Sequence, residues 1–365
     1  MLAPLPFSLC CALLLCLPLA IIFTITNPIP ITTLTTTHKK YPVTPPPSPP
    51  EDDESLFRLA ARMNPKPWPP GSPKKLAFMF LTTTPLPFAP IWELFFNQTH
   101  TNKNLFNIYI HADPSFPYDP PFSGVFTGRV IHSKPTQRST PSLVSAARRL
   151  LAHALLDDPA NAMFPLLSAS CIPLHSFNFT YQTLIRSKKS FIEILNNEPS
   201  AYSRYVVRGE EAMLPEIPFE DFRLGSQFFV LTRRHARLVV KDERVWDKFN
   251  LPCVRWDTCY PEENYFPTLL NMKDPNGCVP ATLTHVDWTG LSDGHPHTYQ
   301  ASEVGPELIL SLRSDRPRYG DTGGGNVTNS STRTKRDDPF LFARKFSPES
   351  LQPLMRIANE FIFRD

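Results

Sequence analysis

The feature that most constrains the fold is an alternation of apolar runs with amphipathic stretches from residue 74 onward. Residues 76–81, 104–114 and 163–174 contain buried-strand patterns that run into polar loops, and a helix starts near 89–92. Residues 142–159 have apolar residues at helical spacing, with Ser142 as the expected N-cap and Pro159 beyond the end. This alternation predicts an α/β fold with a mostly parallel sheet covered on both faces.

The loops that follow the predicted strands are the expected binding region. In open parallel sheets, ligands bind at the carboxyl ends of the strands, which here leads to loops 82–90, 111–114 and 168–173. A further strand is expected at 225–231, followed by a helix with basic residues on its outer face. We expect order to return at 339–346, and a closing helix at 348–363, after a surface loop at 320–338. Thr82, Thr83 and Thr84 are candidates to bind a nucleotide base. Ser168 and Ser170 are candidates for contacts with the donor or the acceptor. Gly225 and Ser226 would allow the main chain to approach a ligand closely.

Proline is unevenly distributed in the first third of the chain. The sequence has 42 prolines against 13 glycines, and residues 27–73 include "TPPPSPPEDDES", which favours extended polyproline II rather than a core. Residues 8–25 carry no charge and approach the roughly 20 residues that span a bilayer. We therefore expect an anchor at 1–26, a stem at 27–73 and a folded domain at 74–365, with most of the chain translocated; a cleaved signal peptide is the alternative.

Cysteines and glycosylation sequons are compatible with a secretory route. Four cysteines lie in the folded part, which permits either two disulfides in one of three connectivities or four buried thiols. These cysteines are Cys171, Cys253, Cys259 and Cys278, and the sequons lie at Asn97, Asn178, Asn326 and Asn329.

Several function classes lack their sequence signals. The net charge is only +3, which does not indicate nucleic-acid binding. The chain has no phosphate-binding glycine loop, no GxSxG elbow and no D-x-D triplet that would hold a metal–nucleotide complex. The pair His295 and His297 lies in a turn-like segment, so we do not expect it to bind a metal.

Two adjacent acids in "CYPEENYFPTLL" (259–270) have two possible roles. Glu262 and Glu263 follow a proline at the head of an apolar run. They can begin a helix, because the helix N-terminus favours negative charge. Alternatively, one of them can be a partly desolvated catalytic base.

Motifs in order across 74–363 resemble one family. "LAFMFLTTTPLPFAPIWELFF", "IYIHADP", "ARRLLAHALLDDP", "PLLSASCIPL", "LGSQFFVLTRRHARLVV", "CYPEENYFPTLL", "LTHVDWTG" and "LFARKF" are similar to the plant core-2/I-branching β-1,6-N-acetylglucosaminyltransferase-like family. The resemblance implies a type II Golgi membrane protein with a GT-A-like domain. It also implies an inverting transferase that moves N-acetylglucosamine, xylose or glucuronic acid from a UDP-sugar to a glycan or glycoprotein without a metal.

The resemblance also implies roles for individual residues. Glu263 matches the catalytic base, with Glu262 in place of the usual Asp and Asn264 in place of the usual His. Lys345, with Arg344 beside it, matches the basic residue that stabilises the leaving diphosphate. Other implied contacts are Asp113 with the nucleoside and Trp288 with the acceptor. A helix or turn cap is the alternative role for Asp113, and a buried core position is an equal alternative for Trp288.

Two features leave alternatives open. The segment "VPATLTHVDW" (279–288) has no Arg where many relatives have one, so a second basic partner is not placed. The missing Arg and the replacement of the usual His by Asn264 leave open a catalytically silent scaffold of the same fold. A hydrolase would need a second acid near Glu263.

Overall fold

The computed structural model describes residues 50–63, 72–98, 104–255, 257–289, 295–321 and 336–365. The chain divides into compact units 1–48 and 49–365, and every described residue belongs to the second unit. The expected anchor at 1–26, most of the expected stem, most of the 320–338 loop, and the sequons at Asn326 and Asn329 lie outside the described residues. Within the ranges given above, no helix has the length and apolar character needed to cross a membrane.

A six-stranded sheet forms the centre of the unit, in the order β2-β1-β3-β6-β5-β7. The strands β2, β1 and β3 are parallel neighbours, β5 and β7 are parallel, and β6 is antiparallel to β3 and β5. The predicted α/β fold with a mostly parallel sheet is therefore confirmed. The strands are β1 (Lys75–Thr82), β2 (Phe106–Ala112), β3 (Asn161–Ser168), β5 (Ser190–Phe191), β6 (Val230–Thr232) and β7 (Cys278–Val279).

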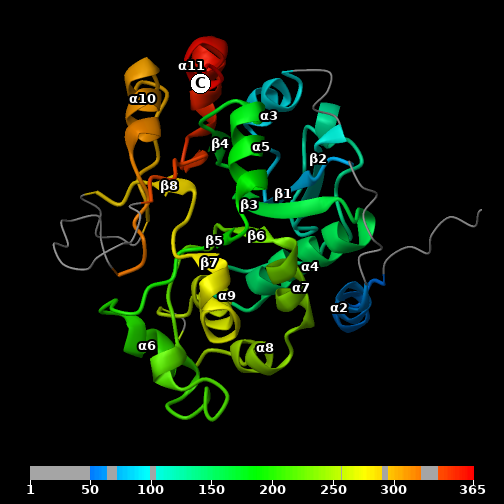
Figure 1. Cartoon of the computed structure of the whole chain (residues 1–365), viewed down its shortest axis with the longest axis vertical. Helices are drawn as coiled ribbons and strands as arrows, with labels where there is room; N and C mark the ends of the chain where they lie inside the picture. Colours follow the sequence, from blue (N-terminus) through cyan, green and yellow to red (C-terminus); the bar gives the residue numbers. More distant parts are fainter. Residues whose placement is uncertain (1–49, 64–71, 99–103, 256, 290–294, 322–335) are drawn as a thin grey trace, which may run out of the picture. The chain divides into compact units, whose positions relative to one another are not determined.

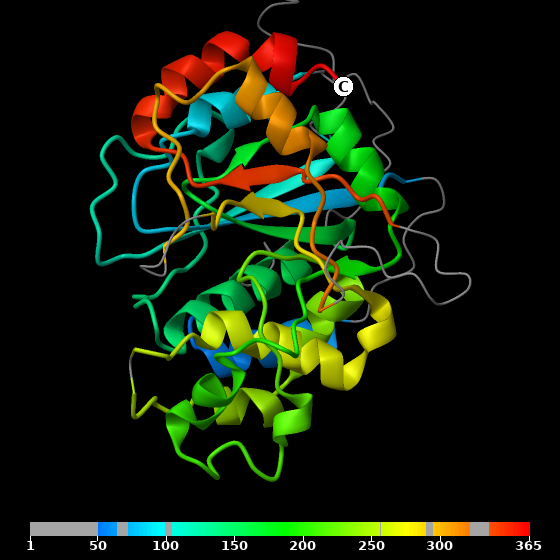
Figure 2. The same cartoon turned by 90° about the vertical axis from the view of Figure 1, so that its left-hand side faces the viewer.

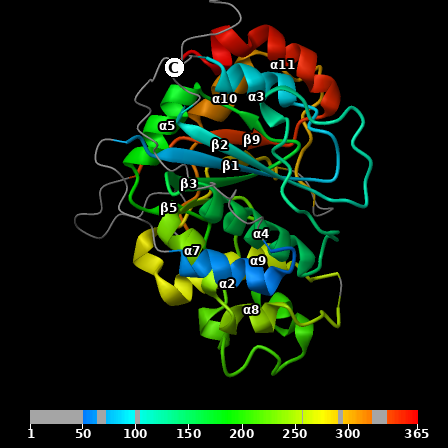
Figure 3. The same cartoon turned by 90° about the vertical axis from the view of Figure 1, so that its right-hand side faces the viewer.

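Helices cover both faces of this sheet (Figures 1 and 2). Along β1, Leu76, Phe78 and Phe80 pack into one apolar cluster while Ala77 and Met79 pack into the other, as the two-residue period of a strand requires. The first cluster includes α3 (Ala89–Phe96), α5 (Phe177–Arg186), α10 (Pro306–Ser314) and α11 (Leu351–Ile357). The second includes α2 (Asp53–Arg62), α4 (Ser142–Asp157), α7 (Arg233–Lys241), α8 (Arg244–Phe249) and α9 (Pro261–Lys273), seen from another side in Figure 3.

A second, three-stranded sheet packs within the first cluster. Its order is β4 (Ile172–Pro173), β9 (Phe342–Arg344), β8 (Thr284–Val286), with β8 and β9 parallel. Ile172 pairs with Ala343, so the end of β9 is brought close to the loop that follows β3. The remaining short elements are η2 (Gly124–Phe126), α6 (Ala201–Tyr205), η3 (Val206–Arg208), η4 (Phe219–Asp221), η5 (Pro275–Gly277), η6 (Pro348–Ser350) and η7 (Ala358–Ile362).

The helix α2 lies inside the range expected to be an extended stem. Asp52 caps it, accepting a hydrogen bond from the Ser55 amide at 2.7 Å. Leu56, Phe57 and Ala60 are buried against the second cluster. Residues 53–62 thus differ from the expectation, because helical spacing of apolar residues behind an acidic N-terminus outweighs the prolines on either side.

Three further expectations need local correction. Only Val230–Thr232 of the expected strand 225–231 is a strand, because the Gly225 amide donates to the Glu263 carbonyl at 2.9 Å instead of to a sheet neighbour. Ser142 is the first residue of α4 and not its cap; its hydroxyl accepts from the Gln137 amide. The closing helix is divided into η6, α11 and the wider turn η7.

Candidate active site

The helix α9 begins with the two adjacent acids. Pro261 is in its first turn, and no side chain caps its N-terminus. Proline is favoured there because it has no amide hydrogen that would need a partner. The free amides and the helix dipole favour the negative charges of Glu262 and Glu263. Helix initiation and a chemical role are therefore compatible at this position.

Glu263 is partly exposed and held by an arginine. Its Oε2 accepts from Arg204 Nη1 at 2.7 Å, and its side chain remains 34% exposed. The Arg204 guanidinium lies 4.6 Å from the centre of the Tyr260 ring, which restricts its position. Arg204 thus fixes one carboxylate oxygen, and Oε1 has no hydrogen-bond partner within the part of the chain that the structure describes.

Glu262, in contrast, is buried. Burial raises the pKa of its carboxyl group to about 7, and the negative charge of Glu263 adds to this rise. The positive charges of Arg138 and Arg204 oppose it. Its Oε2 lacks a hydrogen-bond partner among the described residues.

Two cations at the end of β9 lie near these acids. Burial lowers the pKa of Arg344, while the negative charge of Glu263 raises it. Burial also lowers the pKa of Lys345, and the charge of Arg344 lowers it further. Neither cation is in an ion pair with a carboxylate of the described residues. The charge of Arg344 thus interacts with Glu263 on one side and with Lys345 on the other. The catalytic role of Glu263 and the leaving-group role of the two cations stay predictions.

The loops that follow β1 and β2 are joined to each other by hydrogen bonds. Thr82 is buried and accepts from the Thr84 amide at 3.0 Å, while Thr83 and Thr84 are exposed. Tyr118 donates to the carbonyls of Thr82 and Asp113. These contacts leave the outer threonines accessible for a ligand.

Asp113 is fully buried, and both of its oxygens are used within the protein. Oδ1 accepts from the Ser115 amide, and Oδ2 accepts from the amide and hydroxyl of Thr136, both at 2.7 Å. Asp113 therefore fixes the loop that precedes α4. A direct contact with a nucleoside stays a prediction.

The loop after β3 lies beside the β9 cations. The hydroxyls of Ser168 and Ser170 are 3.1 Å apart, and Ser168 Oγ lies 3.2 Å from Cys171 Sγ. Ile172, next to Cys171, pairs with Ala343, which precedes Arg344 in β9. The two serines thus border the cation cluster.

A second acid near Glu263 was not identified from the sequence. Burial raises the pKa of Glu193, and the charge of Glu263 adds to this rise. A Cβ atom at Gly225 would lie 2.1 Å from the Glu193 carbonyl oxygen, so only glycine fits against the main chain here. The backbone amide of the next residue, Ser226, hydrogen-bonds to Glu193. Glu193 follows the two-residue strand β5, which is too short to be read from the sequence pattern.

Other predicted residues lie at the surface. Trp288 is 55% exposed, which excludes the alternative of a buried core tryptophan. The side chains of Asn97 and Asn178 are exposed, as an attached glycan would require. Asn264 is buried and donates to the Arg223 carbonyl at 3.3 Å, so it has a structural contact.

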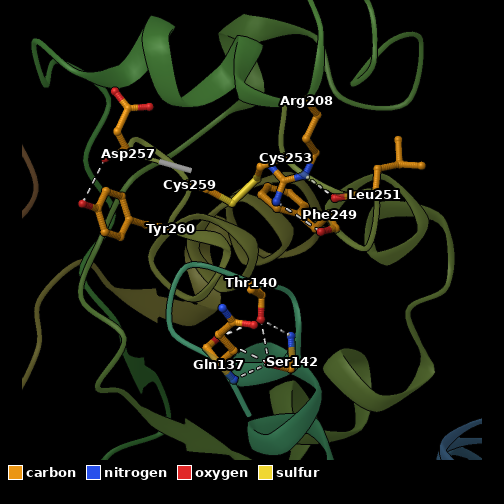
Figure 4. The surroundings of a disulfide bond; sticks show 10 residues. All are labelled: Gln137, Thr140, Ser142, Arg208, Phe249, Leu251, Cys253, Asp257, Cys259 and Tyr260. Atoms are coloured by element: carbon orange, nitrogen blue, oxygen red, sulfur yellow. Dashed lines mark hydrogen bonds between the residues drawn. A yellow bond between two sulfur atoms is a disulfide. The ribbon is translucent and has the colours of Figure 1, made fainter. Parts of the chain in front are cut away.

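A disulfide closes the segment before α9. Cys253 and Cys259 are bonded, while Cys171 and Cys278 are buried free thiols, so each alternative left open by the sequence holds for one pair. Figure 4 shows the disulfide with Tyr260 directly after Cys259. Because Tyr260 packs on Arg204, the cross-link restrains the chain that positions Glu263.

The two histidines of the HPH segment have different partners. His295 Nε2 lies 2.9 Å from Arg138 Nη1, and His297 Nε2 lies 2.8 Å from Glu303 Oε1. No group of three or more His, Cys, Asp or Glu side chains is placed to hold a metal ion in the described ranges.

Known proteins match most of this chain. Residues 76–313 match the family model described as Core-2/I-Branching enzyme. A curated protein of Oryza sativa subsp. japonica, named "Glycosyltransferase BC10", is 34% identical over 319 residues, which covers 79% of this chain and 77% of the relative.

Proposed function

The chain belongs to the Core-2/I-branching enzyme family and is a glycosyltransferase, and from this premise we propose an inverting, metal-independent mechanism with a UDP-sugar as donor. The family implies a nucleotide-sugar donor and a glycan acceptor. The observation that carries the mechanism is the placement of Glu263 at the start of α9, within electrostatic reach of the cation Arg344 at the end of β9.

Glu263 acts as the general base. It takes the proton from the acceptor hydroxyl as that oxygen attacks the anomeric carbon, opposite the bond to the diphosphate. Arg204 holds Oε2, so Oε1 is the oxygen presented to the acceptor. One base is sufficient, because the attacking and leaving groups are on opposite faces of the sugar.

Lys345 and Arg344 stabilise the leaving group. As the bond between the anomeric carbon and the diphosphate oxygen breaks, its electron pair goes to that oxygen, and fixed cations lower the energy of the developing charge. Burial and repulsion from nearby cations lower the pKa values of both side chains. A bound anion would offset this repulsion.

The strand-end loops hold the remaining groups. We propose that Thr83 and Thr84 contact the uracil ring of the donor nucleotide. Thr82 and Asp113 hold the loop in shape through their hydrogen bonds within the protein. The exposed Trp288 provides an apolar ring for an acceptor sugar. The cleft is completed by Ser168, Ser170, Gly225, Ser226 and Glu262.

The sugar and the location belong to the same proposal. N-acetylglucosamine, xylose and glucuronic acid are the proposed donor sugars, with a glycan or glycoprotein hydroxyl as acceptor. We place the enzyme at the Golgi membrane as a type II protein with residues 1–26 as anchor and the catalytic unit in the lumen, since residues 8–25 are uncharged and sequons follow.

A donor screen in EDTA tests the mechanism. The purified protein is incubated with UDP-N-acetylglucosamine, UDP-xylose and UDP-glucuronic acid, with Glu263→Gln in parallel. We expect transfer of one sugar with inverted configuration in EDTA, and roughly 1000-fold less transfer by the variant, because general base catalysis typically provides 10²- to 10⁴-fold.

Three outcomes would contradict the proposal. Transfer that requires an added divalent ion would exclude the metal-independent mechanism. Nucleotide binding without transfer by either protein would indicate a silent scaffold. Release of free sugar from glycans would indicate a hydrolase that uses Glu193 or Glu262 as its second acid.

A further inference from the structure

The loop between β2 and α4 carries a cation that the sequence did not single out, Arg138. Two sets of hydrogen bonds restrain the loop on either side of this residue. On one side, Thr136 donates to Asp113 through its amide and its hydroxyl. On the other, Thr140 Oγ1 donates to the Gln137 carbonyl at 2.8 Å, and the Gln137 amide donates to Ser142, as Figure 4 shows.

The backbone next to Arg138 is strained. Ser139 has a φ of 63°, in the left-handed region, and no other non-glycine residue of the described ranges has a positive φ. Such a conformation is rare for residues other than glycine and persists only where surrounding contacts enforce it. The strained residue and the two sets of hydrogen bonds therefore hold the main chain around Arg138 in one conformation.

Arg138 connects two loops at the carboxyl edge of the sheets. Its Nη1 donates to Nε2 of His295, in the segment after β8, at 2.9 Å. An arginine has no acceptor atom, so the His295 nitrogen must be the acceptor. The guanidinium has five N–H donors in a fixed fork, so others are available for a planar or tetrahedral anion.

The segment that begins with His295 joins Arg138 to the end of β9: the Tyr299 amide, four residues after His295, donates to the Lys345 carbonyl at 2.9 Å. The charge of Arg138 acts on both cations there. It opposes protonation of both Arg344 and Lys345, and it favours the ionised form of Glu262. Arg138, like Arg344 and Lys345, forms no ion pair with a carboxylate that the structure describes. Arg138 is exposed, so its remaining N–H groups are accessible to a ligand. Three unpaired cations in mutual range form a site for an anion with more than one negative charge.

We propose that Arg138 is a third ligand of the donor diphosphate and supplies the second arginine that segment 279–288 lacks. This inference rests on the proposed function, because the anion is the leaving group of that reaction. As the bond to the anomeric carbon breaks, Arg138 donates N–H groups to the diphosphate oxygens from the side opposite β9. Its hydrogen bond with His295 holds it in place before the donor binds.

Binding of UDP and uridine to the full chain by calorimetry tests this role. We expect Arg138→Ala to weaken UDP binding roughly tenfold to hundredfold and to leave uridine binding unchanged, since a hydrogen bond to a charged group contributes about that much. Arg138→Lys retains the charge without the fork and should recover part of the affinity. Arg129→Ala, an exposed arginine earlier on the same connection, is the matched control and should change neither affinity.

The outcomes separate this inference from the proposed function. If Arg138→Ala binds UDP like the wild type while Lys345→Ala binds it weakly, the role of Arg138 is wrong and the proposed function remains. If Arg138→Ala weakens uridine and UDP equally, it acts on the nucleoside pocket and not on the diphosphate. If the wild type binds no UDP, the proposed donor is wrong.

Discussion

Two clusters of polar and titratable side chains in this molecule differ in how completely their hydrogen bonds are satisfied within the protein. In the first, His235 Nδ1 lies 2.7 Å from Ser190 Oγ and its Nε2 lies 2.9 Å from Asp274 Oδ2. Ser190 and His235 are buried and Asp274 is half-buried, and Ser190 also accepts from the Thr232 amide. In the second, the candidate active site, Glu262 Oε2 and Arg344 Nε are buried without a hydrogen-bond partner among the described residues.

The hydrogen bonds of the first cluster are satisfied within the protein, and those of Glu262 and Arg344 are not fully satisfied there. The His235 chain has the composition of a hydrolytic triad, but Ser190 is 0% exposed and no substrate reaches it. A buried network with every member paired makes the fold specific. Buried groups left unpaired are unfavourable for folding, and they are retained where a ligand completes them.

Replacing Lys345 in the cleft should give the largest effect. We expect Lys345→Ala to lower kcat roughly 100- to 1000-fold, as removal of one preorganised group at a developing charge does, with an unchanged melting temperature. Lys345→Arg keeps the charge and should recover part of the rate. Steady-state kinetics and thermal unfolding measure both; an unfolded Lys345→Ala protein would place this residue with the structural cluster.

The His235 cluster should respond in the opposite way. His235→Ala removes one hydrogen bond each from Ser190 and Asp274 and opens a cavity, so we expect the free energy of unfolding to fall by about 3 kcal/mol. The kcat per folded molecule should not change. Denaturant unfolding and kinetics at low temperature measure this, with exposed His132→Ala as control. A loss of kcat at unchanged stability would mean that the buried triad is catalytic.

The pH dependence of folding stability tests whether Glu262 is a buried group without a partner in the protein. Its folded pKa of about 7 exceeds the ordinary value of 4.5, so its contribution to stability is complete below about pH 4.5 and is lost as pH rises through about 7. Glu262→Gln removes this dependence, and we expect the wild type to lose about 2 kcal/mol relative to the variant between pH 5 and pH 7.5. Unfolding curves at several pH values measure it. Parallel pH profiles for both proteins would show that Glu262 is not buried as a protonated acid.

Much of the fold followed from local pattern. The strands β1, β2 and β3 and the helices α3, α4 and α7 were expected near their observed positions, because buried strands and amphipathic helices have periodicities that neighbours in sequence define. The pieces that were missed are short or depend on distant contacts. The two-residue strand β5 and the irregular main chain at 225–229 gain their hydrogen bonds from residues far along the chain.

The sequence by itself determined the α/β class, the family, and the identity of the acids and cations at 262–263 and 344–345, since each depends on residues close together in the chain. Only the tertiary structure decided which of the two glutamates is buried, that Arg204 holds Glu263, and that Arg138 contacts His295. The physical reason is that burial and electrostatic interaction depend on distance in space, and residues 138, 204, 263 and 344 become neighbours only when the sheets and helices pack.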